Sequence, residues 1–194
     1  FQLKHIVSPD RLFSNYIYKS GTSSFFREHF KSFAKVIHDN KEGYRLRVLE
    51  IGSNDGILLD ELKSLGINCV GLEPSHELVK ECLERGLDVI HGFLTRDLVS
   101  ELNKSRGAFD VVVGNNVFAH IDDLLEAFRC VNQLLETNGV FIFEVADFSQ
   151  IRDKGIFDSI YHEHMSFHTA TGLQLLAEMS DFTIEKYSYV DSHG

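Results

Sequence analysis

The chain has 194 residues, of which 43% are hydrophobic and 25% are charged, and its formal net charge is -10 at pH 7. A chain of this length can bury one sizeable core, and its composition is that of an ordinary soluble globular domain. The negative charge argues against nucleic acid as a partner, because phosphate binding needs a basic surface. No apolar run is long enough to span a membrane, and no secretory signal opens the sequence.

The three cysteines, Cys69, Cys82 and Cys130, are widely spaced and form no C-x-x-C pair. They argue against a disulfide framework or a cysteine-based zinc site within the chain, and they favour a reducing cytoplasm. Phe1 is not a natural start, and the chain stops directly after a strand-like run. We therefore expect a middle segment of a longer protein, of unspecified oligomeric state.

Residues 1–45 are predicted to form an N-terminal helical segment. One apolar helix face is indicated by the spacing of Phe25, Phe26, Phe30, Phe33 and Ile37. We expect one or two helices that pack on the following domain or over its active edge.

Residues 46–194 alternate short apolar runs with amphipathic segments. Buried strands are predicted at residues 48–51, 68–72, 87–90, 109–113 and 140–145. A helix is predicted from Asp122 to a stop at Asn138 and Gly139, with Leu135 in its apolar stripe. A further helix at residues 171–179 precedes a sixth predicted strand at 183–190. The alternation predicts an α/β fold with a mostly parallel sheet.

A long irregular segment at residues 146–168 carries the densest set of proton-exchanging side chains. Tyr161, His162, Glu163 and His164 are consecutive, and imidazole titrates near neutral pH. Loops of this length inside a domain are usually functional or disordered. The cluster is therefore a proton-transfer centre, a metal site or an exposed polar loop.

The first predicted strand runs into a glycine-containing turn with Glu50, Gly52, Asn54, Asp55 and Gly56. Glycine lets the backbone turn sharply and approach a ligand closely. The spacing is neither G-x-G-x-x-G nor a phosphate loop. Its two acidic residues would repel a pyrophosphate and would suit a ligand that carries positive charge.

Two more polar segments follow predicted strands. Glu73 ends the second strand, where an acidic side chain can accept both hydroxyls of a ribose. Asn115, Asn116 and His120 follow the fourth strand, and Asn115 or Asn116 could bind the amino-acid part of a ligand at the same sheet edge. A cationic ligand that contains ribose is S-adenosylmethionine. A plain strand-to-helix turn and a dinucleotide site are the alternatives.

With these residues assembled, the chain resembles the sugar C-methyltransferases, which methylate C3 of nucleotide-linked 4-keto-deoxysugars. The matching segments contain Tyr16 and Tyr18, Ser-Gly-Thr-Ser at 20–23, residues 49–56, Gly-Leu-Glu-Pro at 71–74, Asn-Val-Phe-Ala-His at 116–120, Phe157 and Asp158, residues 161–164, and His193 with Gly194. The resemblance spans nearly the whole chain. It implies a class I methyltransferase fold, S-adenosylmethionine as methyl donor and S-adenosylhomocysteine as product.

The resemblance also has implications for parts beyond the catalytic domain. Family members usually carry an N-terminal domain with a cysteine-bound zinc and a further C-terminal α/β domain, and neither is expected within these residues. The substrate would be an anionic nucleotide sugar. Its basic contacts would come from those other parts or from Arg11, Lys19 and Arg27.

Methylation beside a ketone needs a base and a group that stabilises the developing enolate. The resemblance assigns the base to His164, with Glu163 to orient and tune it. His120 and Tyr161 would donate to the ketone or enolate oxygen. In an extended segment His162 points away from His164, because successive side chains alternate.

Three other interpretations stay open. His162, His164 and His168 could bind zinc around a carboxylate, although no H-E-x-x-H spacing is present. The chain could instead be an O- or N-methyltransferase that acts on another small metabolite. It could also be a non-catalytic domain that only binds S-adenosylmethionine.

Overall fold

The computed structural model describes residues 7–14, 16, 19–39, 46–156, 159–161 and 163–190. The predicted motif residues Tyr18, Phe157, Asp158, His162, His193 and Gly194 lie outside the described residues. Within this part of the chain, the dominant feature is a five-stranded parallel sheet of order β3-β2-β1-β4-β5. Its strands are β1 (Arg47–Ile51), β2 (Asn68–Glu73), β3 (Val89–His91), β4 (Phe109–Asn115) and β5 (Leu135–Glu144).

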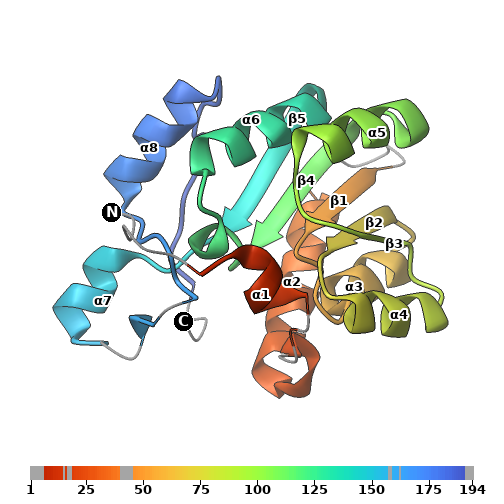
Figure 1. Ribbon diagram of the computed structural model, residues 1–194, viewed down its shortest axis with the longest axis horizontal. Helices are drawn as coiled ribbons and strands as arrows, with labels where there is room; N and C mark the ends of the chain where they lie inside the picture. Colours follow the sequence, from red (N-terminus) through yellow and green to blue (C-terminus); the bar gives the residue numbers. More distant parts are fainter. Residues whose placement is uncertain are drawn as a thin grey trace.

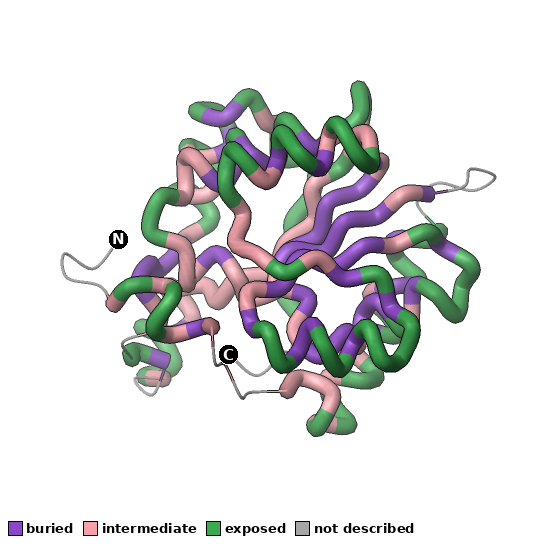
Figure 2. Tube along the Cα trace, turned by 45° about the vertical axis from the view of Figure 1, so that its right-hand side comes forward, coloured by how far each residue is buried: buried purple, intermediate pink, exposed green. Residues whose placement is uncertain are grey.

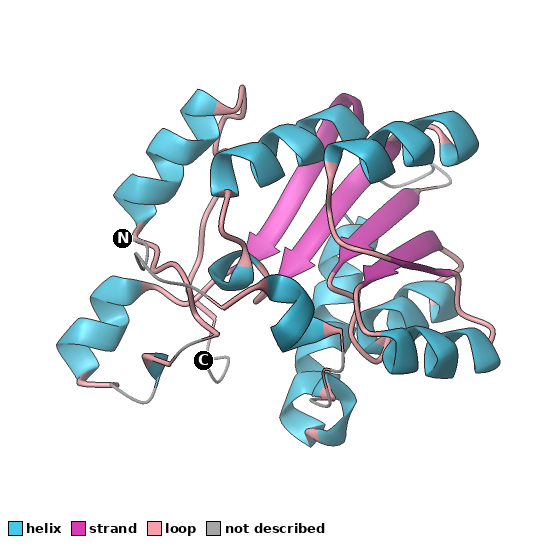
Figure 3. Cartoon of the chain, in the orientation of Figure 1, coloured by secondary structure: helices cyan, strands magenta, loops and turns pink. Residues whose placement is uncertain are grey.

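Helices cover both faces of this sheet (Figure 3). The long helices are α2 (Ser24–Asp39), α3 (Ile57–Ser64), α4 (His76–Glu84), α5 (Arg96–Arg106), α6 (Leu124–Leu134) and α8 (Ala170–Met179). Shorter helical turns are α1 (Pro9–Phe13), η1 (Ser20–Thr22), η2 (Phe118–His120) and α7 (Phe148–Lys154). Helices on both faces are the expected consequence of parallel strands, because each strand-to-strand crossover passes over the sheet.

The core has two layers, one on each side of the sheet. On one side, α2 and α3 pack against β1 and β4 through residues such as Ile37, Leu62 and Val113. On the other side, α5 and α6 pack through residues such as Leu102 and Val131. In Figure 2 the central strands are buried along most of their length, whereas the helices alternate between buried and exposed positions. The prediction of an α/β fold with N-terminal helices is confirmed.

Three local predictions are wrong. The helix predicted to reach Asn138 ends at Leu134, because Leu135 adopts extended backbone and pairs with Phe109 as the first residue of β5. The segment at 146–168 is not wholly irregular, since it contains α7. Phe25 does not belong to the buried face of α2, because 38% of its surface is exposed.

The sixth predicted strand is also wrong, since residues 183–190 form no strand. Within the described part of the chain, this run has no neighbouring strand with which to form a ladder, and strand-forming residues need such a partner. Its side chains are exposed, with 74% of the surface of Tyr187 accessible. The segment is attached instead by a hydrogen bond from the Tyr189 hydroxyl to Asp147 Oδ2, 2.8 Å long.

The carboxyl ends of the strands meet at one edge of the sheet, and the N-terminal segment lies across this edge. In Figure 1 the arrowheads of β4 and β5 point toward α1. Polar residues that follow different strands are thereby brought together, as is general for ligand sites of open α/β sheets. No helix in the described part of the chain is long and apolar enough to cross a membrane.

Candidate active site

The turn between β1 and α3 is tightly packed beneath the loop that follows β4. Gly52 has φ +67°, and a Cβ atom there would lie 2.4 Å from Cγ2 of Val117. Only glycine combines this backbone conformation with so close an approach. Gly56, with φ +74°, ends the turn and precedes the first residue of α3. The two glycines that the sequence singled out therefore shape the turn itself.

Three carboxylates crowd this edge, from Glu50 in β1, Asp55 in the turn and Glu73 at the end of β2. Burial, reinforced by the charges of Glu73 and Asp55, holds the pKa of Glu50 well above its usual range. Burial also raises the pKa of Glu73, against hydrogen bonds from the main-chain amides of Ser75 and Asn54. A cationic ligand would offset the cost of ionising such a cluster.

Several polar atoms at this edge are buried and have no hydrogen-bond partner among the described residues. They are Glu50 Oε2, Ser53 Oγ, Asp55 Oδ1 and both side-chain polar atoms of Asn115. Buried polar groups in folded proteins are nearly always paired, so a cluster of unpaired ones indicates a polar ligand. Carboxylates, a hydroxyl and an amide fit the ammonium, sulfonium and hydroxyl groups of S-adenosylmethionine.

Asn116 shapes the backbone, whereas Asn115 offers side-chain atoms that are unpaired among the described residues. Its φ is +55°, and its main-chain amide donates to the Glu144 carbonyl, 2.9 Å away. Asparagine tolerates this left-handed conformation better than most residues. The structure therefore gives Asn116 a turn-forming position at the start of the loop that carries His120.

The N-terminal segment closes over the β1–α3 turn. Main-chain amides of Ser20 and Gly21 donate to Asn54 Oδ1 at 3.0 Å and to Asp55 Oδ2 at 2.9 Å. Lys19 forms an ion pair with Glu81 of α4, 2.6 Å long. These contacts of Asn54 and Asp55 were not predicted, although Ser-Gly-Thr-Ser was recognised as a motif. No local pattern could reveal them, because they join residues 34 positions apart.

The second cluster lies where η2 meets the segment at 159–166. The Tyr161 hydroxyl is 2.9 Å from His164 Nε2, and His164 Nδ1 is 2.8 Å from the Ser159 carbonyl oxygen. A carbonyl can only accept, so Nδ1 carries the proton, and Nε2 accepts from Tyr161. The rings of His120 and His164 lie 5.1 Å apart between centroids.

His120 is held in the same way as His164. Its Nδ1 donates to the Glu163 carbonyl, 2.9 Å away, so in the neutral ring Nε2 is an acceptor. Burial lowers the pKa of His120, and the Phe13 ring of α1 packs edge-on against it at 5.3 Å. Glu163 thus contacts His120 through its main-chain carbonyl. The hydrogen-bond partner of His164 Nδ1 is the Ser159 carbonyl and not the Glu163 carboxylate that was predicted.

Of the three histidines of the rival zinc interpretation, His164 and His168 lie in different surroundings, and His162 lies outside the described residues. Nε2 of His168 is 3.1 Å from the Ser166 hydroxyl, and burial lowers the pKa of His168 to about 4. Among the described residues, no group of three or more His, Cys, Asp or Glu side chains is placed to hold a metal ion.

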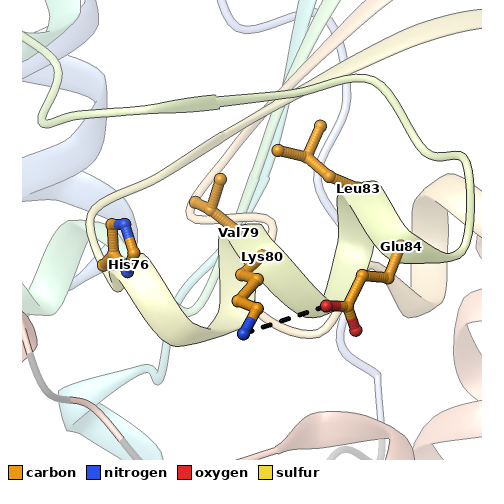
Figure 4. Close-up of a pocket in the computed structure, with 5 residues that line it drawn as sticks. All are labelled: His76, Val79, Lys80, Leu83 and Glu84. Atoms are coloured by element: carbon orange, nitrogen blue, oxygen red, sulfur yellow. Dashed lines mark ion pairs between the residues drawn. The ribbon is translucent and has the colours of Figure 1, made fainter.

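A surface pocket lies apart from both clusters. It follows one face of α4 and is lined by His76, Val79, Lys80, Leu83 and Glu84 (Figure 4). Lys80 and Glu84 form an ion pair of 3.9 Å across one helical turn. None of the predicted site residues lines it, whereas the buried polar atoms that lack a partner among the described residues lie at the sheet edge.

Comparison with known proteins agrees with this geometry. A family model described as a methyltransferase domain matches residues 23–187. The chain therefore belongs to the methyltransferase-domain family. A SAM-dependent methyltransferase from Archaeoglobus fulgidus has a similar structure, with a TM-score of 0.65 at 21% identity over 86% of this chain and 79% of that one. The predicted class I fold and the S-adenosylmethionine cofactor are confirmed, and the chain is an S-adenosylmethionine-dependent methyltransferase domain.

Two curated relatives represent different kinds of methyl transfer. C-methyltransferase NovU of Streptomyces niveus is 30% identical over 196 residues, which cover 99% of this chain and 46% of NovU. The mitochondrial ubiquinone biosynthesis O-methyltransferase of Rattus norvegicus is 26% identical over 111 residues, or 55% of this chain and 32% of that enzyme. The chain thus spans at most about half the length of these relatives.

Proposed function

We propose that this chain catalyses carbon methylation at C3 of a nucleotide-linked 4-keto-deoxysugar. The observation that carries the proposal is the pairing of Tyr161 with His164 beside His120, near the sheet edge that carries the proposed donor site. The similarity to NovU, a protein named as a C-methyltransferase, supports transfer to carbon.

His164 is the proposed base. The bond from Nδ1 to the Ser159 carbonyl leaves the lone pair of the ring on Nε2. Rotation of the Tyr161 O–H away from Nε2 frees this lone pair and aims the phenolic hydrogen at the ketone oxygen. His164 then takes the C3 proton, and the electron pair moves onto the ketone oxygen, where the Tyr161 hydroxyl stabilises the enolate.

Bound S-adenosylmethionine supplies the electrophilic methyl group for the enolate carbon. Glu50, Asp55 and Asn115 are the proposed partners of its cationic amino-acid part, since each has a buried polar atom that finds no hydrogen-bond partner among the described residues. Glu73, at the end of β2, is the proposed partner of the ribose. The turn glycines Gly52 and Gly56 and the amide of Asn54 complete the binding loop, with Asn116 at its border.

His120 is proposed to act at the oxygen side of the substrate. Its Nδ1 proton is committed to the Glu163 carbonyl, so the ring can donate through Nε2 only after it gains a second proton. Burial opposes that protonation by lowering the pKa of His120. Tyr161 is therefore the principal donor to the enolate, and Glu163 acts by setting the His120 tautomer.

The nucleotide phosphates are assigned to Arg11. Of the three cations expected to contact the substrate, Lys19 pairs with Glu81 and Arg27 donates to the Gly21 carbonyl, 2.7 Å away. Lys19 thus attaches the N-terminal segment to α4, and Arg27 makes a contact within that segment. Arg11 is exposed on α1, the helix whose Phe13 contacts His120. An exposed guanidinium at this place suits a diphosphate.

Hydrogen exchange at C3 tests the proposal directly. With S-adenosylhomocysteine in place of the donor, the full-length protein in deuterated water should exchange the C3 hydrogen of a nucleotide-linked 4-keto-deoxysugar. His164→Asn should abolish both exchange and methylation while its affinity for S-adenosylhomocysteine changes less than twofold. Methylation by His164→Asn at the normal rate would show that another group is the base.

O-methylation is the second candidate function, favoured by the similarity to the ubiquinone O-methyltransferase. The same His164 lone pair could take a proton from a hydroxyl group. Mass spectrometry of the methylated product separates the two: methyl on oxygen or nitrogen without C3 exchange supports the second candidate. Binding of S-adenosylhomocysteine without turnover of any substrate would indicate a domain that only binds the donor.

A further inference from the structure

The two histidines of the proposed site belong to segments more than 40 positions apart in sequence. Main-chain hydrogen bonds join these segments: the amides of Met165 and Ser166 both donate to the Ala119 carbonyl, at 2.8 and 3.2 Å. The His120 ring adds a third bond, to the Glu163 carbonyl. The separation of the His120 and His164 rings therefore depends on how residues 118–120 register against residues 163–166.

The side chain of Ser166 lies at the centre of this junction. It is 3% exposed, and its hydroxyl donates to the Phe118 carbonyl, 3.1 Å away. His168 approaches the same hydroxyl with Nε2 at 3.1 Å. The single Ser166 proton is used toward Phe118, so the neutral His168 ring donates and the serine oxygen accepts. Ser166 is thus satisfied as both donor and acceptor, entirely within the protein.

Phe118 is a fixed reference point for this contact. Its ring is fully buried and packs edge-on against Phe128, Phe141 and Phe143 at 5.3–5.6 Å between centroids. Phe141 and Phe143 belong to β5, and Phe128 to α6. The Ser166 hydroxyl therefore ties the segment that carries His164 to the rigid sheet core through the residue two positions before His120.

We infer that Ser166 is a positioning residue that sets the distance between the His120 and His164 rings. The inference rests on the proposed function, in which both rings face one substrate. A displacement of about 1 Å at reacting groups can cost on the order of a hundredfold in rate. Ser166 itself touches no substrate in this scheme, so its loss should lower kcat and leave donor affinity intact.

Ser166→Ala removes the hydroxyl, and Ser180→Ala is the matched control. Ser180 is also a buried serine, 1% exposed, but its hydroxyl donates to the Leu176 and Ala177 carbonyls at the end of its own helix, α8. We expect Ser166→Ala to lower kcat for C3 methylation about tenfold, with KM and S-adenosylhomocysteine affinity changed less than twofold. Ser180→Ala should keep the wild-type kcat, and Ser166→Thr, which retains the hydroxyl, should recover most of it.

A spectroscopic measurement keeps this inference separate from the proposed reaction. NMR titration of the histidine ring protons of the full-length protein, with S-adenosylhomocysteine bound, reports on the His120 environment without turnover. Ser166→Ala should move the His120 titration toward that of an exposed histidine, because the ring is less firmly buried beside His164 and Glu163. Ser180→Ala should leave it unchanged.

Failure of the proposed function and failure of the Ser166 role give different results. If wild type shows no C3 exchange, the proposed function fails, and the NMR comparison alone decides the role of Ser166. If Ser166→Ala matches Ser180→Ala in both kcat and His120 titration, the positioning role is overturned. Should Ser166→Ala not fold, as judged by circular dichroism, Ser166→Cys replaces it, since it keeps the size of the side chain but donates weakly.

Discussion

The hydroxyl of Tyr161 donates to Nε2 of His164 over 2.9 Å, so the proposed base and the proposed enolate donor are hydrogen bonded to each other. Nδ1 of the same histidine donates to the Ser159 carbonyl. The base is thereby fixed in one tautomer, with its reactive nitrogen on the side of Tyr161. Tyr161 is 42% exposed, so this side is accessible from solvent.

Tyr161→Phe is predicted to lower kcat roughly a hundredfold, the usual cost of losing one donor to a developing oxyanion. Binding of S-adenosylhomocysteine should change less than twofold, as measured by calorimetry. Tyr189→Phe is the control, since the Tyr189 hydroxyl also bonds a side chain, Asp147, but lies outside the histidine cluster. A Tyr161→Phe enzyme with normal kcat would remove the tyrosine from the mechanism.

Replacement of Glu73 should weaken donor binding. Its two oxygens accept from the amides of Asn54 and Ser75, each 2.8 Å away, which places the carboxylate at the end of β2 facing the turn. Glu73→Gln retains one acceptor oxygen and should raise the Kd for S-adenosylhomocysteine about tenfold, since a hydrogen bond to a charged group contributes about 1.5 kcal/mol or more. Glu73→Ala should raise it further.

The control for Glu73 is Glu84→Gln, on the exposed side of α4. Glu84 pairs with Lys80 on the helix surface, so its replacement should leave the Kd unchanged. Unaltered donor affinity in both Glu73 variants would contradict the ribose assignment.

Gly52→Ala is predicted to destabilise the fold and to weaken donor binding together. The added Cβ would approach Val117 to 2.4 Å, in a residue whose φ is +67°. Gly66→Ala has the same backbone strain, with φ +75°, but meets no atom within 4 Å. The difference between the two variants isolates the clash, and urea unfolding should show Gly52→Ala about 1–3 kcal/mol less stable than Gly66→Ala. Equal stabilities would show that the turn and the β4 loop separate readily.

The pair His29–Glu144 should make stability depend on pH. Its atoms are 2.9 Å apart, and the two side chains are 14% and 12% exposed. The hydrogen bond that the His29 ring donates to the Glu144 carboxylate raises the pKa of His29. A raised folded-state pKa means that the stabilisation is fully present below the ordinary histidine pKa of 6.5 and is lost as pH rises through the folded value.

His29→Gln should therefore destabilise the protein on the order of 1 kcal/mol at pH 6 and by less at pH 8. Urea unfolding at the two pH values measures this difference. His38→Gln, which removes a solvent-exposed partner of Asp39, should cost little at either pH. A constant cost of His29→Gln across this range would show that the charge on the ring is not involved.

Much of the fold was predictable because it depends on local periodicity. The Val- and Ile-rich runs at β1, β2 and β4 are buried on both faces, and such strands read as continuous apolar segments. The run at 183–190 has similar composition but forms no strand, since a strand requires a partner that composition does not reveal. The end of α6 was misplaced for a related reason, because pairing of Leu135 with Phe109 ends the helix early.

Local patterns in the amino-acid sequence were enough to show that acidic and glycine residues follow β1 and that four proton-exchanging side chains are consecutive at 161–164. The contacts that these residues make follow from the folded arrangement of the chain. Several hydrogen bonds depend on this geometry. The main-chain amides of Ser20 and Gly21 donate to the side chains of Asn54 and Asp55. The His164 ring donates to the Ser159 carbonyl, and the Ser166 hydroxyl donates to the Phe118 carbonyl. A hydrogen bond needs its donor and acceptor within about 3 Å of each other. Residues far apart in sequence come this close only when the sheet brings their segments together.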